Sequence, residues 1–257
     1  MKLDDVKKLH QKRYREEFGY FLIEGEHLVL ELEKAAAQNP ALHDCEIYVT
    51  SEHEQRRSPF TTHLISNIQM AGLAETRTPQ GIVALVPLLP TTVPTTTPAG
   101  EQAIYLYEVQ DPGNLGTILR TLAWFGNYRC LLSPGSVDPY NSKVVRASTG
   151  AIFHVPIEID VELGSLATRF TRIACLDMHG GSLQSPEFRQ FDCYLFGNEA
   201  RGVPREHLAS LETKPFTIAG NGAIESLNLA SAVNMCVYEL KRERANLAAP
   251  SVPGDVP

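Results

Sequence analysis

The amino-acid sequence predicts an α/β protein, and three segments in its C-terminal part carry this prediction. In each segment an apolar strand runs into a polar turn that contains glycine and asparagine. The segments are residues 103–126, 191–204 and 217–242. Open α/β sheets build their binding sites at turns where a strand gives way to a helix. One such turn alone is also an ordinary connection, whereas three of them favour a functional site.

The N-terminal part is predicted to be a smaller α/β domain, residues 1–88. It opens with a basic helical stretch and contains a helix over Leu28–Ala37. Strands are predicted at residues 20–23, 47–49, 63–65 and 81–86. The last of them is continuously apolar, which predicts a strand in the interior of the sheet.

A stretch rich in proline and threonine is predicted to separate two domains. Proline fixes φ and lacks a backbone donor, so an extended linker is expected at residues 89–100. The second domain is placed at residues 101–244. Residues 245–257 are again rich in proline and poor in large apolar residues, which predicts a disordered tail.

The first of the three segments begins with a predicted strand over Ala103–Val109. The turn Asp111–Asn114 follows, because proline, glycine and asparagine favour turn conformations. A helix then continues to Gly126, with an apolar face formed by Ile118, Leu119, Leu122 and Phe125. The turn presents Asn114, and Arg120 lies about two turns into the helix.

Between the first and second segments the sequence alternates again between predicted strands and helices. A strand is predicted at 128–133, a helix at 163–171 and a further strand at 172–177. Residues 178–182 contain a histidine beside two glycines. A surface loop is favoured there over a catalytic histidine.

The second and third segments end in polar residues. The strand Phe191–Phe196 leads into the turn Gly197–Pro204. Thr217–Ala219 leads through a glycine-rich turn into Glu225–Asn228, which opens a predicted helix over Leu229–Arg242.

In order and in residue type, these three blocks resemble the three motifs of the SpoU (TrmH) family of RNA ribose 2′-O-methyltransferases, within the SPOUT superfamily. The resemblance covers roughly residues 101–243, and three ordered motifs are a specific signal. It implies a mostly parallel sheet with a deep trefoil knot, although true knots are rare. It also implies a homodimer, because SPOUT sites are completed at a subunit interface. A weaker resemblance over the N-terminal region implies a small, ribosomal-protein-like domain that binds the RNA substrate.

The resemblance implies five catalytic residues: Asn114, Arg120, Glu199, Ser226 and Asn228. Arg120 matches the arginine at the ribose 2′-oxygen, and because free arginine has a pKa above about 12, both general-base action and mere orientation of the hydroxyl stay open. Glu199 would orient Arg120 or the ribose, and Asn114 would hold substrate or shape the pocket. Ser226 and Asn228 are expected both to cap a helix and to contact the site.

The cofactor that the resemblance implies is S-adenosylmethionine. Methyl transfer to an alcohol needs in-line approach and a polar cradle for a sulfonium group. The implied cofactor positions are Phe196, Gly197, Asn198, Gly202, Ile218 and Leu227. Three departures from the family pattern, at Ile218–Gly220, at Ala200-Arg201 and at Asn234, loosen the expected cofactor geometry but leave every polar position filled.

Charge does not by itself point to nucleic acid. The formal net charge is −7, which argues against binding by bulk electrostatics. A local basic run at residues 7–15 is more often a solvated helix face, yet beside the methyltransferase motifs it favours RNA. The predicted RNA contacts are Lys7, Lys8, Lys12 and Arg13, together with Arg146 and Ser148 from a block that also resembles the family. For Arg146, pairing of a helix-end cation with a carboxylate is an equal alternative.

Composition indicates which broad class of protein the sequence belongs to. The 257 residues, 43% hydrophobic and 21% charged, are typical of a globular protein. No apolar run reaches membrane-spanning length and no signal peptide is recognised, so a cytoplasmic protein without membrane contact is expected. The five scattered cysteines predict reduced, buried thiols and no metal site.

The sequence is compared with the needs of three other functions: a different cofactor enzyme, a non-catalytic RNA-binding protein and a transfer-RNA methyltransferase. A different α/β cofactor enzyme would need a phosphate-binding loop, and the sequence has neither GxGxxG after a strand nor GxxxxGK[ST]. A non-catalytic RNA-binding relative acting in ribosome assembly would have less need of Arg120 and Glu199 together. Transfer RNA is the alternative substrate, and ribosomal RNA is favoured by analogy with the N-terminal extension.

Overall fold

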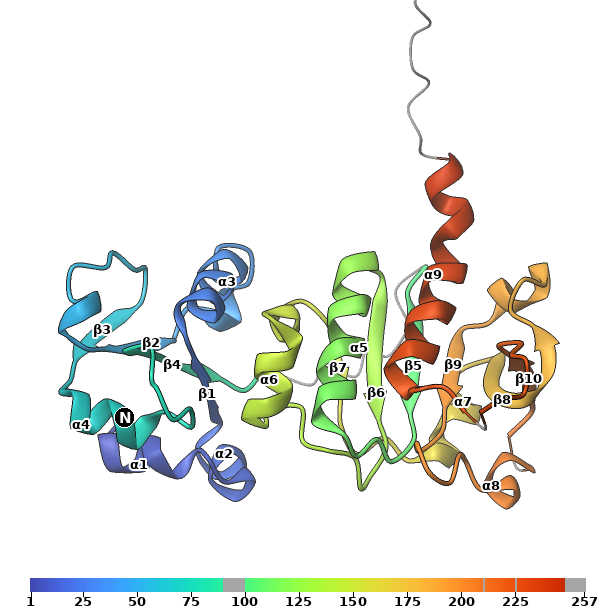
Figure 1. The fold of residues 1–257 in the computed structure, drawn as a ribbon, viewed down its shortest axis with the longest axis horizontal. Coiled ribbons are helices and arrows are strands. Elements are labelled where there is room, and N and C mark those ends of the chain that lie inside the picture. Colours follow the sequence, from blue (N-terminus) through green and yellow to red (C-terminus); the bar gives the residue numbers. More distant parts are fainter. Residues whose placement is uncertain (90–99, 210, 225, 248–257) are drawn as a thin grey trace, which may run out of the picture.

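A computed structural model describes residues 1–89, 100–209, 211–224 and 226–247 of the chain. Almost all of the predicted linker 89–100 and most of the predicted tail lie outside the described residues, as does Glu225. Within the described part, two α/β units lie next to each other (Figure 1). None of its helices is both long enough and apolar enough to cross a membrane.

The N-terminal unit contains a mixed sheet that is four-stranded within the described residues, in the order β1-β4-β2-β3. The strands are β1 (Tyr20–Glu24), β2 (Glu46–Val49), β3 (Thr61–Leu64) and β4 (Ile82–Pro87). Strand β4 pairs antiparallel with β1 and with β2, whereas β2 and β3 are parallel. The prediction that the apolar run at 81–86 forms an interior strand is therefore confirmed.

Helices cover both faces of this sheet. They are α1 (Leu3–Lys8), α2 (Lys12–Phe18), α3 (Glu26–Ala36) and α4 (Asn67–Leu73), with short 3-10 turns η1 (Pro40–Leu42) and η2 (Ser51–His53). Helix α3 packs on one face, and α1 and α4 pack on the other. The basic run does not form one helix, because helix α1 ends at Lys8 and helix α2 begins at Lys12.

The C-terminal unit contains a sheet that is six-stranded in the described part of the chain, in the order β10-β8-β9-β5-β6-β7. All of its pairings are parallel, as the α/β prediction requires. The strands are β5 (Gln102–Leu106), β6 (Tyr128–Leu132), β7 (Ile157–Glu158), β8 (Ile173–Ser182), β9 (Cys193–Phe196) and β10 (Thr213–Thr217).

Two strands differ from the prediction. Strand β5 ends at Leu106, three residues before the predicted Val109, and the turn starts correspondingly earlier. Residues 178–182, predicted as a surface loop, continue strand β8: Gly181 and Ser182 pair with Phe216 and Thr217 beyond a register shift. Their side chains are exposed, which is why a polar, glycine-rich sequence conceals a strand here.

Helices α5 and α9 cover one face of this sheet and α7 and α8 lie over the other (Figure 1). The helices are α5 (Pro112–Phe125), α6 (Ser142–Ser148), α7 (Leu166–Arg169), α8 (Arg205–Ala209) and α9 (Leu229–Leu247), with 3-10 turns η3 (Ala151–Phe153), η4 (Leu163–Ser165) and η5 (Pro186–Gln190). The helix predicted at 163–171 is only η4 followed by the short α7. Helix α9 runs through Leu247, so residues 245–247 are helical and do not belong to a tail.

The two units share a hydrophobic core. Val145 of α6 and Ile152 and Phe153 of η3 are buried in the same cluster as α3, β1 and β4. Arg15, part of the predicted basic run, is also buried between the units and not exposed. The N-terminal unit is therefore packed directly against the C-terminal one.

Candidate active site

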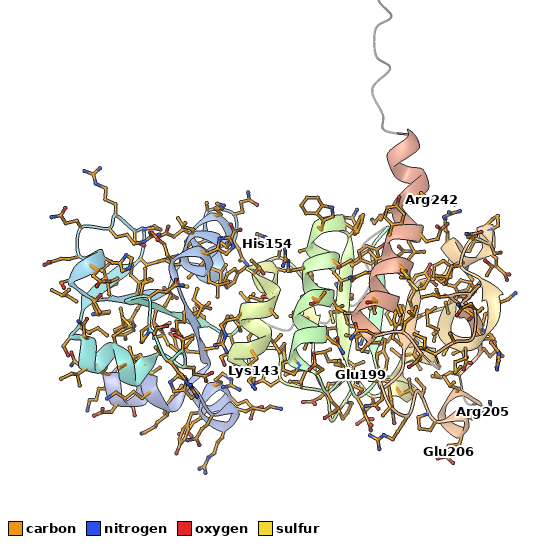
Figure 2. All side chains as sticks on the ribbon, viewed as in Figure 1. Lys143, His154, Glu199, Arg205, Glu206 and Arg242 are labelled. Atoms are coloured by element: carbon orange, nitrogen blue, oxygen red, sulfur yellow. The ribbon has the colours of Figure 1, made fainter. Side chains whose placement is uncertain are left out.

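A pocket lies at the carboxyl ends of the two central strands, β5 and β9, against the loop that precedes α9. Its volume is about 500 Å³. It is lined by Gln110, Asp111, Asn114, Asn198, Glu199, Ala200, Ser226, Leu227, Asn228 and Leu229. In Figure 2 the labelled Glu199 marks its position, below α5. The pocket thus gathers residues from all three segments that the sequence singled out.

The first wall of the pocket is the start of helix α5. Asp111 is the N-cap residue, and its Oδ1 accepts a hydrogen bond of 2.7 Å from the backbone N–H of Asn114. Pro112 follows at the first helical position, where its missing N–H costs nothing. The Asp-Pro pair therefore fixes where α5 begins and directs Asn114 toward the neighbouring turns.

A chain of hydrogen bonds connects the three turns through Asn114. Its Nδ2 donates to Glu199 Oε1 at 3.1 Å, and its Oδ1 accepts from Asn228 Nδ2 at 2.8 Å. Asn228 Oδ1 accepts from the backbone N–H of Ser231 at 3.2 Å, so Asn228 caps α9 and contacts the site at once. Ser226 lines the same pocket. Four of the five predicted catalytic residues are thus brought together.

Arg120 is the predicted catalytic residue that does not reach this pocket. It lies on an exposed face of α5, outside the pocket lining. Arg120 lies six positions after Asn114, which turns it by about 240° around the helix axis. The two side chains therefore point to different sides of α5, and Glu199 contacts Asn114 instead of Arg120.

The turn after β9 is held closed by its own backbone. Asn198 and Gly202 exchange two backbone hydrogen bonds, of 3.2 and 2.9 Å. The side chain of Asn198, which is buried, donates to the carbonyl of Glu108 at 2.7 Å. At Gly197 a Cβ would lie 2.6 Å from Gly202 Cα, so only glycine fits there.

The predicted cofactor positions differ in their access to the pocket. Asn198 and Leu227 line it, and Leu227 is 42% exposed. Phe196 is buried in the core, where its carbonyl accepts the N–H of Tyr107 at 2.9 Å. Ile218 packs against the same core. Gly197, Gly202, Phe196 and Ile218 do not line this pocket.

One departure from the family pattern has a partner in the structure. Thr121 Oγ1 donates to Asn234 Oδ1 at 2.6 Å, which joins α5 to α9 beside the site. Asn234 therefore links α5, which carries Asn114, to α9, which follows Asn228, through a side-chain hydrogen bond.

The predicted RNA contacts are spread over the N-terminal unit and α6. The amines of Lys8 and Lys12 lie 2.8 and 3.5 Å from carboxylates of Asp5 and Glu16, and Lys7 lies 3.4 Å from Asp4. These side chains remain accessible, but part of their charge is offset locally. Arg13 lies over the ring of Tyr14.

The block around α6 gives one correction. Ser148 is fully buried and its hydroxyl donates to the carbonyl of Val145 at 2.8 Å, so the prediction that it contacts RNA is wrong in this structure. The serine instead completes the packing of α6 against α5. Arg146 is partly exposed, and its guanidinium lies 3.9 Å from the carboxylate of Glu75 in the N-terminal unit. This is the pairing with a carboxylate that was the alternative to an RNA contact.

Four residues of the pocket lining are not among the predicted site residues: Gln110, Asp111, Ala200 and Leu229. Gln110 Nε2 donates to the carbonyls of Gly135 at 2.7 Å and Glu108 at 3.1 Å. Asp111 could have been found, because aspartate before proline at the start of an apolar-periodic segment is a helix N-terminus signal. No sequence signal identifies Gln110.

Comparison with known proteins gives two family matches. Residues 101–238 match the SpoU rRNA methylase family, and residues 2–84 match the MRM3-like substrate binding domain. The 23S rRNA (guanosine(2553)-2′-O)-methyltransferase RlmP of Bacillus subtilis is 31% identical over 248 residues, which cover 93% of this chain and 96% of that protein.

Solved structures agree with these matches. A protein from Porphyromonas gingivalis, described as an RNA methyltransferase of the TrmH family, superposes with a TM-score of 0.76 at 28% identity, covering 94% of this chain and 97% of that one. The SpoU methyltransferase AviRb of Streptomyces viridochromogenes, crystallised with AdoMet, has the same fold with a TM-score of 0.80 at 21% identity, covering 95% of this chain and 97% of that one.

Proposed function

The chain belongs to the SpoU rRNA methylase family, and from this premise we propose that it transfers the methyl group of S-adenosylmethionine to a ribose 2′-hydroxyl of ribosomal RNA. The observation that carries the proposal is the hydrogen-bonded series Glu199–Asn114–Asn228 along a pocket at the carboxyl ends of β5 and β9. It supplies amide and carboxylate groups, which suit an uncharged ribose hydroxyl beside a sulfonium cofactor.

In the reaction the ribose 2′-oxygen forms a bond to the methyl carbon while the bond from that carbon to sulfur breaks. S-adenosylhomocysteine leaves, and the hydroxyl proton must pass to a base or to water. Asn114 and Glu199 would hold the hydroxyl in line with the methyl group, which is the larger part of what such a site can contribute. Leu227 and the turn from Gly197 to Gly202 would hold the cofactor.

Arg120 completes this site only if a second copy of the chain supplies it. Trp124 is 85% exposed on α5, and Met235 and Tyr238 are 46% and 57% exposed on the neighbouring α9. Large apolar side chains gathered on two adjacent helices support a homodimer interface there. Sedimentation should therefore give a dimer, and Trp124→Glu should give a monomer; a wild-type monomer would contradict this.

The remaining parts of the proposal follow from the family. Residues 1–88 would bind the RNA substrate, as the match of residues 2–84 supports. Residues 101–244 would carry the methyl-transfer chemistry and the deep trefoil knot, supported by the shared fold. An RNA substrate also supports the expected cytoplasmic location.

The test is methyl transfer from labelled S-adenosylmethionine to total RNA from a strain that lacks the protein. We expect a labelled 2′-O-methylnucleoside, and mapping it should place it in ribosomal RNA. Label in transfer RNA would correct the substrate class. Binding of S-adenosylmethionine without transfer to free RNA or to precursor ribosomal particles would contradict the proposed reaction.

A further inference from the structure

One segment connects the pocket to the N-terminal unit. It comprises residues 133–142, between β6 and α6, and we call it the bridging segment. On the pocket side, Gly135 accepts the side-chain hydrogen bond of Gln110 at 2.7 Å, and the N–H of Val137 donates to the carbonyl of Val109 at 2.8 Å. The segment therefore rests directly on the wall of the pocket.

On its other side the bridging segment binds helix α2 through a buried ion pair. Arg15 Nε donates to Asp138 Oδ2 at 3.1 Å, and Nη2 of the same guanidinium contacts that oxygen as well. Arg15 Nη1 donates to the carbonyls of Leu9 and His10 at 2.7 and 3.0 Å. The two side chains are only 7% and 13% exposed. The guanidinium of Arg15 and the carboxylate of Asp138 are therefore paired with each other away from solvent.

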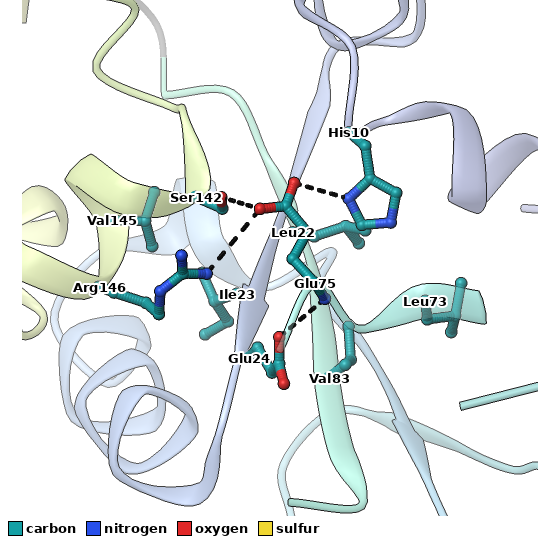
Figure 3. A pocket seen from close by; sticks show the side chains of 10 residues that line it. All are labelled: His10, Leu22, Ile23, Glu24, Leu73, Glu75, Val83, Ser142, Val145 and Arg146. Carbon is teal, nitrogen blue, oxygen red and sulfur yellow. Dashed lines mark hydrogen bonds and ion pairs between the residues drawn. The ribbon is translucent and has the colours of Figure 1, made fainter. Parts of the chain in front are cut away.

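A second polar contact crosses the same boundary (Figure 3). Glu75 of the N-terminal unit accepts a hydrogen bond from Ser142 at the end of the bridging segment, and it lies 3.0 Å from His10 Nδ1 and 3.9 Å from Arg146. The backbone N–H of Glu75 in turn donates to Glu24 of β1 at 3.1 Å.

Apolar contacts fill the space between these polar ones. The ring of Tyr140 packs on Phe21 of β1 with centroids 4.8 Å apart. Units joined by small polar interfaces move relative to each other by default, whereas an apolar, interlocked interface fixes them. A buried ion pair adds little net stability but strongly disfavours arrangements that separate its partners.

We propose that Arg15 and Asp138 are positioning residues for methyl transfer. They hold the N-terminal unit in one orientation, so that RNA bound by that unit presents one ribose to the pocket beside Gln110 and Asn114. The inference rests on the proposed function of both units and deepens it. Selection of the target nucleotide then depends on the fixed distance between the RNA-binding surface of the N-terminal unit and the pocket, in addition to the contacts at the reacting ribose.

Asp138→Asn tests this in the full-length protein. The amide keeps an acceptor for the backbone N–H of Tyr140, which Asp138 Oδ1 accepts at 2.9 Å, but loses the charge that pairs with Arg15. Glu101→Gln is the matched control. It breaks an ion pair with Arg129 of similar burial, 5% and 13% exposed, that lies wholly within the C-terminal unit. Asp138→Asn combined with Tyr140→Ala removes the apolar contact as well.

We expect Asp138→Asn to bind S-adenosylmethionine and RNA within about twofold of wild type, because both binding surfaces are intact. Its kcat on the ribosomal RNA target should fall at least about tenfold, and methylation should spread to neighbouring nucleotides. The double variant should show both effects more strongly, and the control should show neither. A double variant that keeps wild-type kcat and a single methylated position would overturn the proposal. So would an equal loss of turnover in the control.

Small-angle scattering separates this inference from the proposed function. The double variant should have a larger radius of gyration than wild type and the control, whether or not methyl transfer is detected. If the wild-type protein were inactive while the double variant still had the larger radius of gyration, only the proposed reaction would be contradicted. An active wild type whose double variant keeps both shape and turnover would contradict the positioning role alone.

Discussion

Asn228 makes two hydrogen bonds that can be separated by one substitution. Its Oδ1 caps α9, whereas its Nδ2 donates to Asn114. Asn228→Asp keeps an acceptor for the cap but removes the donor and adds a negative charge near Glu199. We expect kcat to fall roughly 10-fold, the effect of losing one hydrogen bond of about 0.5–1.5 kcal/mol and of repulsion from Glu199. Thermal unfolding should change little.

The matched control for this variant is Asn221→Asp in the same loop. Asn221 Oδ1 accepts the N–H of Ala223 at 3.0 Å, a bond that aspartate can also accept. Steady-state kinetics and melting curves on both variants distinguish the roles. Equal loss of kcat in the two would mean that any negative charge in this loop is harmful, and that the bond to Asn114 has no special role.

Arg120 is exposed and lies outside the pocket lining, so its variant tests the proposed dimer as well as the chemistry. Arg120→Ala should lower kcat roughly 10³-fold, within the range that proton-transfer or orienting groups supply. Its affinity for S-adenosylmethionine should stay within about twofold of wild type, as measured by calorimetry.

Mixing Arg120→Ala with Asn114→Ala tests whether the site is shared. If each pocket uses the arginine of the other copy, a mixed dimer has one intact site. Randomly mixed subunits should then recover about a quarter of wild-type activity. No recovery, with dimers confirmed by sedimentation, would place Arg120 and Asn114 in the same protomer's site.

The cysteines are buried thiols, and this predicts a pH dependence of stability. Burial raises the pKa of Cys45, Cys130 and Cys175 to about 12. The unfolded chain loses these protons near pH 8.5 while the native protein keeps them, so the free energy of unfolding should fall as pH rises from about 8.5 toward 12. Urea denaturation at pH 7.5 and 10 measures this.

A thiol reagent distinguishes the cysteines from buried tyrosines, which shift in the same direction. The native protein should react slowly at pH 8, because the reactive species is the thiolate, and the urea-unfolded protein should react at all five positions. Rapid labelling of the native protein would contradict the burial of the thiols.

At the scale of the elements, helices α5 and α6 lie in close contact at Gly116. A Cβ there would lie 2.9 Å from the carbonyl carbon of Ala147 and from the amide nitrogen of Ser148. Alanine ordinarily stabilises a helix relative to glycine by up to about 1 kcal/mol. The steric term should win, so Gly116→Ala should destabilise the protein by about 1–3 kcal/mol.

Gly164→Ala is the control, since no atom lies within 4 Å of a Cβ at that position. Denaturant unfolding should leave its stability near that of wild type. If Gly116→Ala were as stable as this control, α5 and α6 could separate without cost, and the buried Ser148 between them would not define their distance.

The elements with strong apolar patterns were predictable from the sequence. Strands β4 and β9 have buried, continuously apolar runs, and β6 is apolar except for Arg129. Helix α5 combines an Asp-Pro start with an apolar stripe and a final glycine. Their boundaries were correct to within a few residues. Helix α4 was missed although Ser66 and Gln69 form a capping box ahead of it, a signal present in the sequence.

Other features depend on contacts that a sequence does not contain. Residues 178–182 pair through backbone hydrogen bonds while their side chains face solvent, so their polarity indicated a loop. Arginine and serine are residue types that usually lie at the surface, but Arg15 and Ser148 are buried. Arg15 is buried by the packing of one unit on the other, and Ser148 by the packing of α6 on α5. The polar turns predicted the site, whereas the separation of Arg120 from it required the structure.

At the scale of the whole molecule, the negative net charge makes any RNA-binding surface local. Lys12→Ala combined with Arg13→Ala should weaken RNA binding and reduce the slope of log affinity against log salt by about 1–2, because each phosphate contact contributes about 0.7–0.9. Filter binding at several salt concentrations measures the slope.

Lys34→Ala combined with Lys214→Ala is the control. It removes the same charge from two exposed lysines that pair with Glu31 and Glu187, away from α2. A control slope that falls as much as that of the α2 variant would mean a diffuse effect of net charge. An unchanged slope in the α2 variant would place the RNA elsewhere.

The order of the parallel strands also sets the order in which a growing chain can become an enzyme. The N-terminal sheet is complete at Pro87, but its core also needs Val145, Ile152 and Phe153. Strand β5 pairs Ile104 with Tyr194, so the centre of the second sheet stays open until β9 has left the ribosome. Asn228 closes the pocket only after that. A chain cut short anywhere before α9 therefore lacks one wall of this pocket, and we expect it to be inactive in methyl transfer.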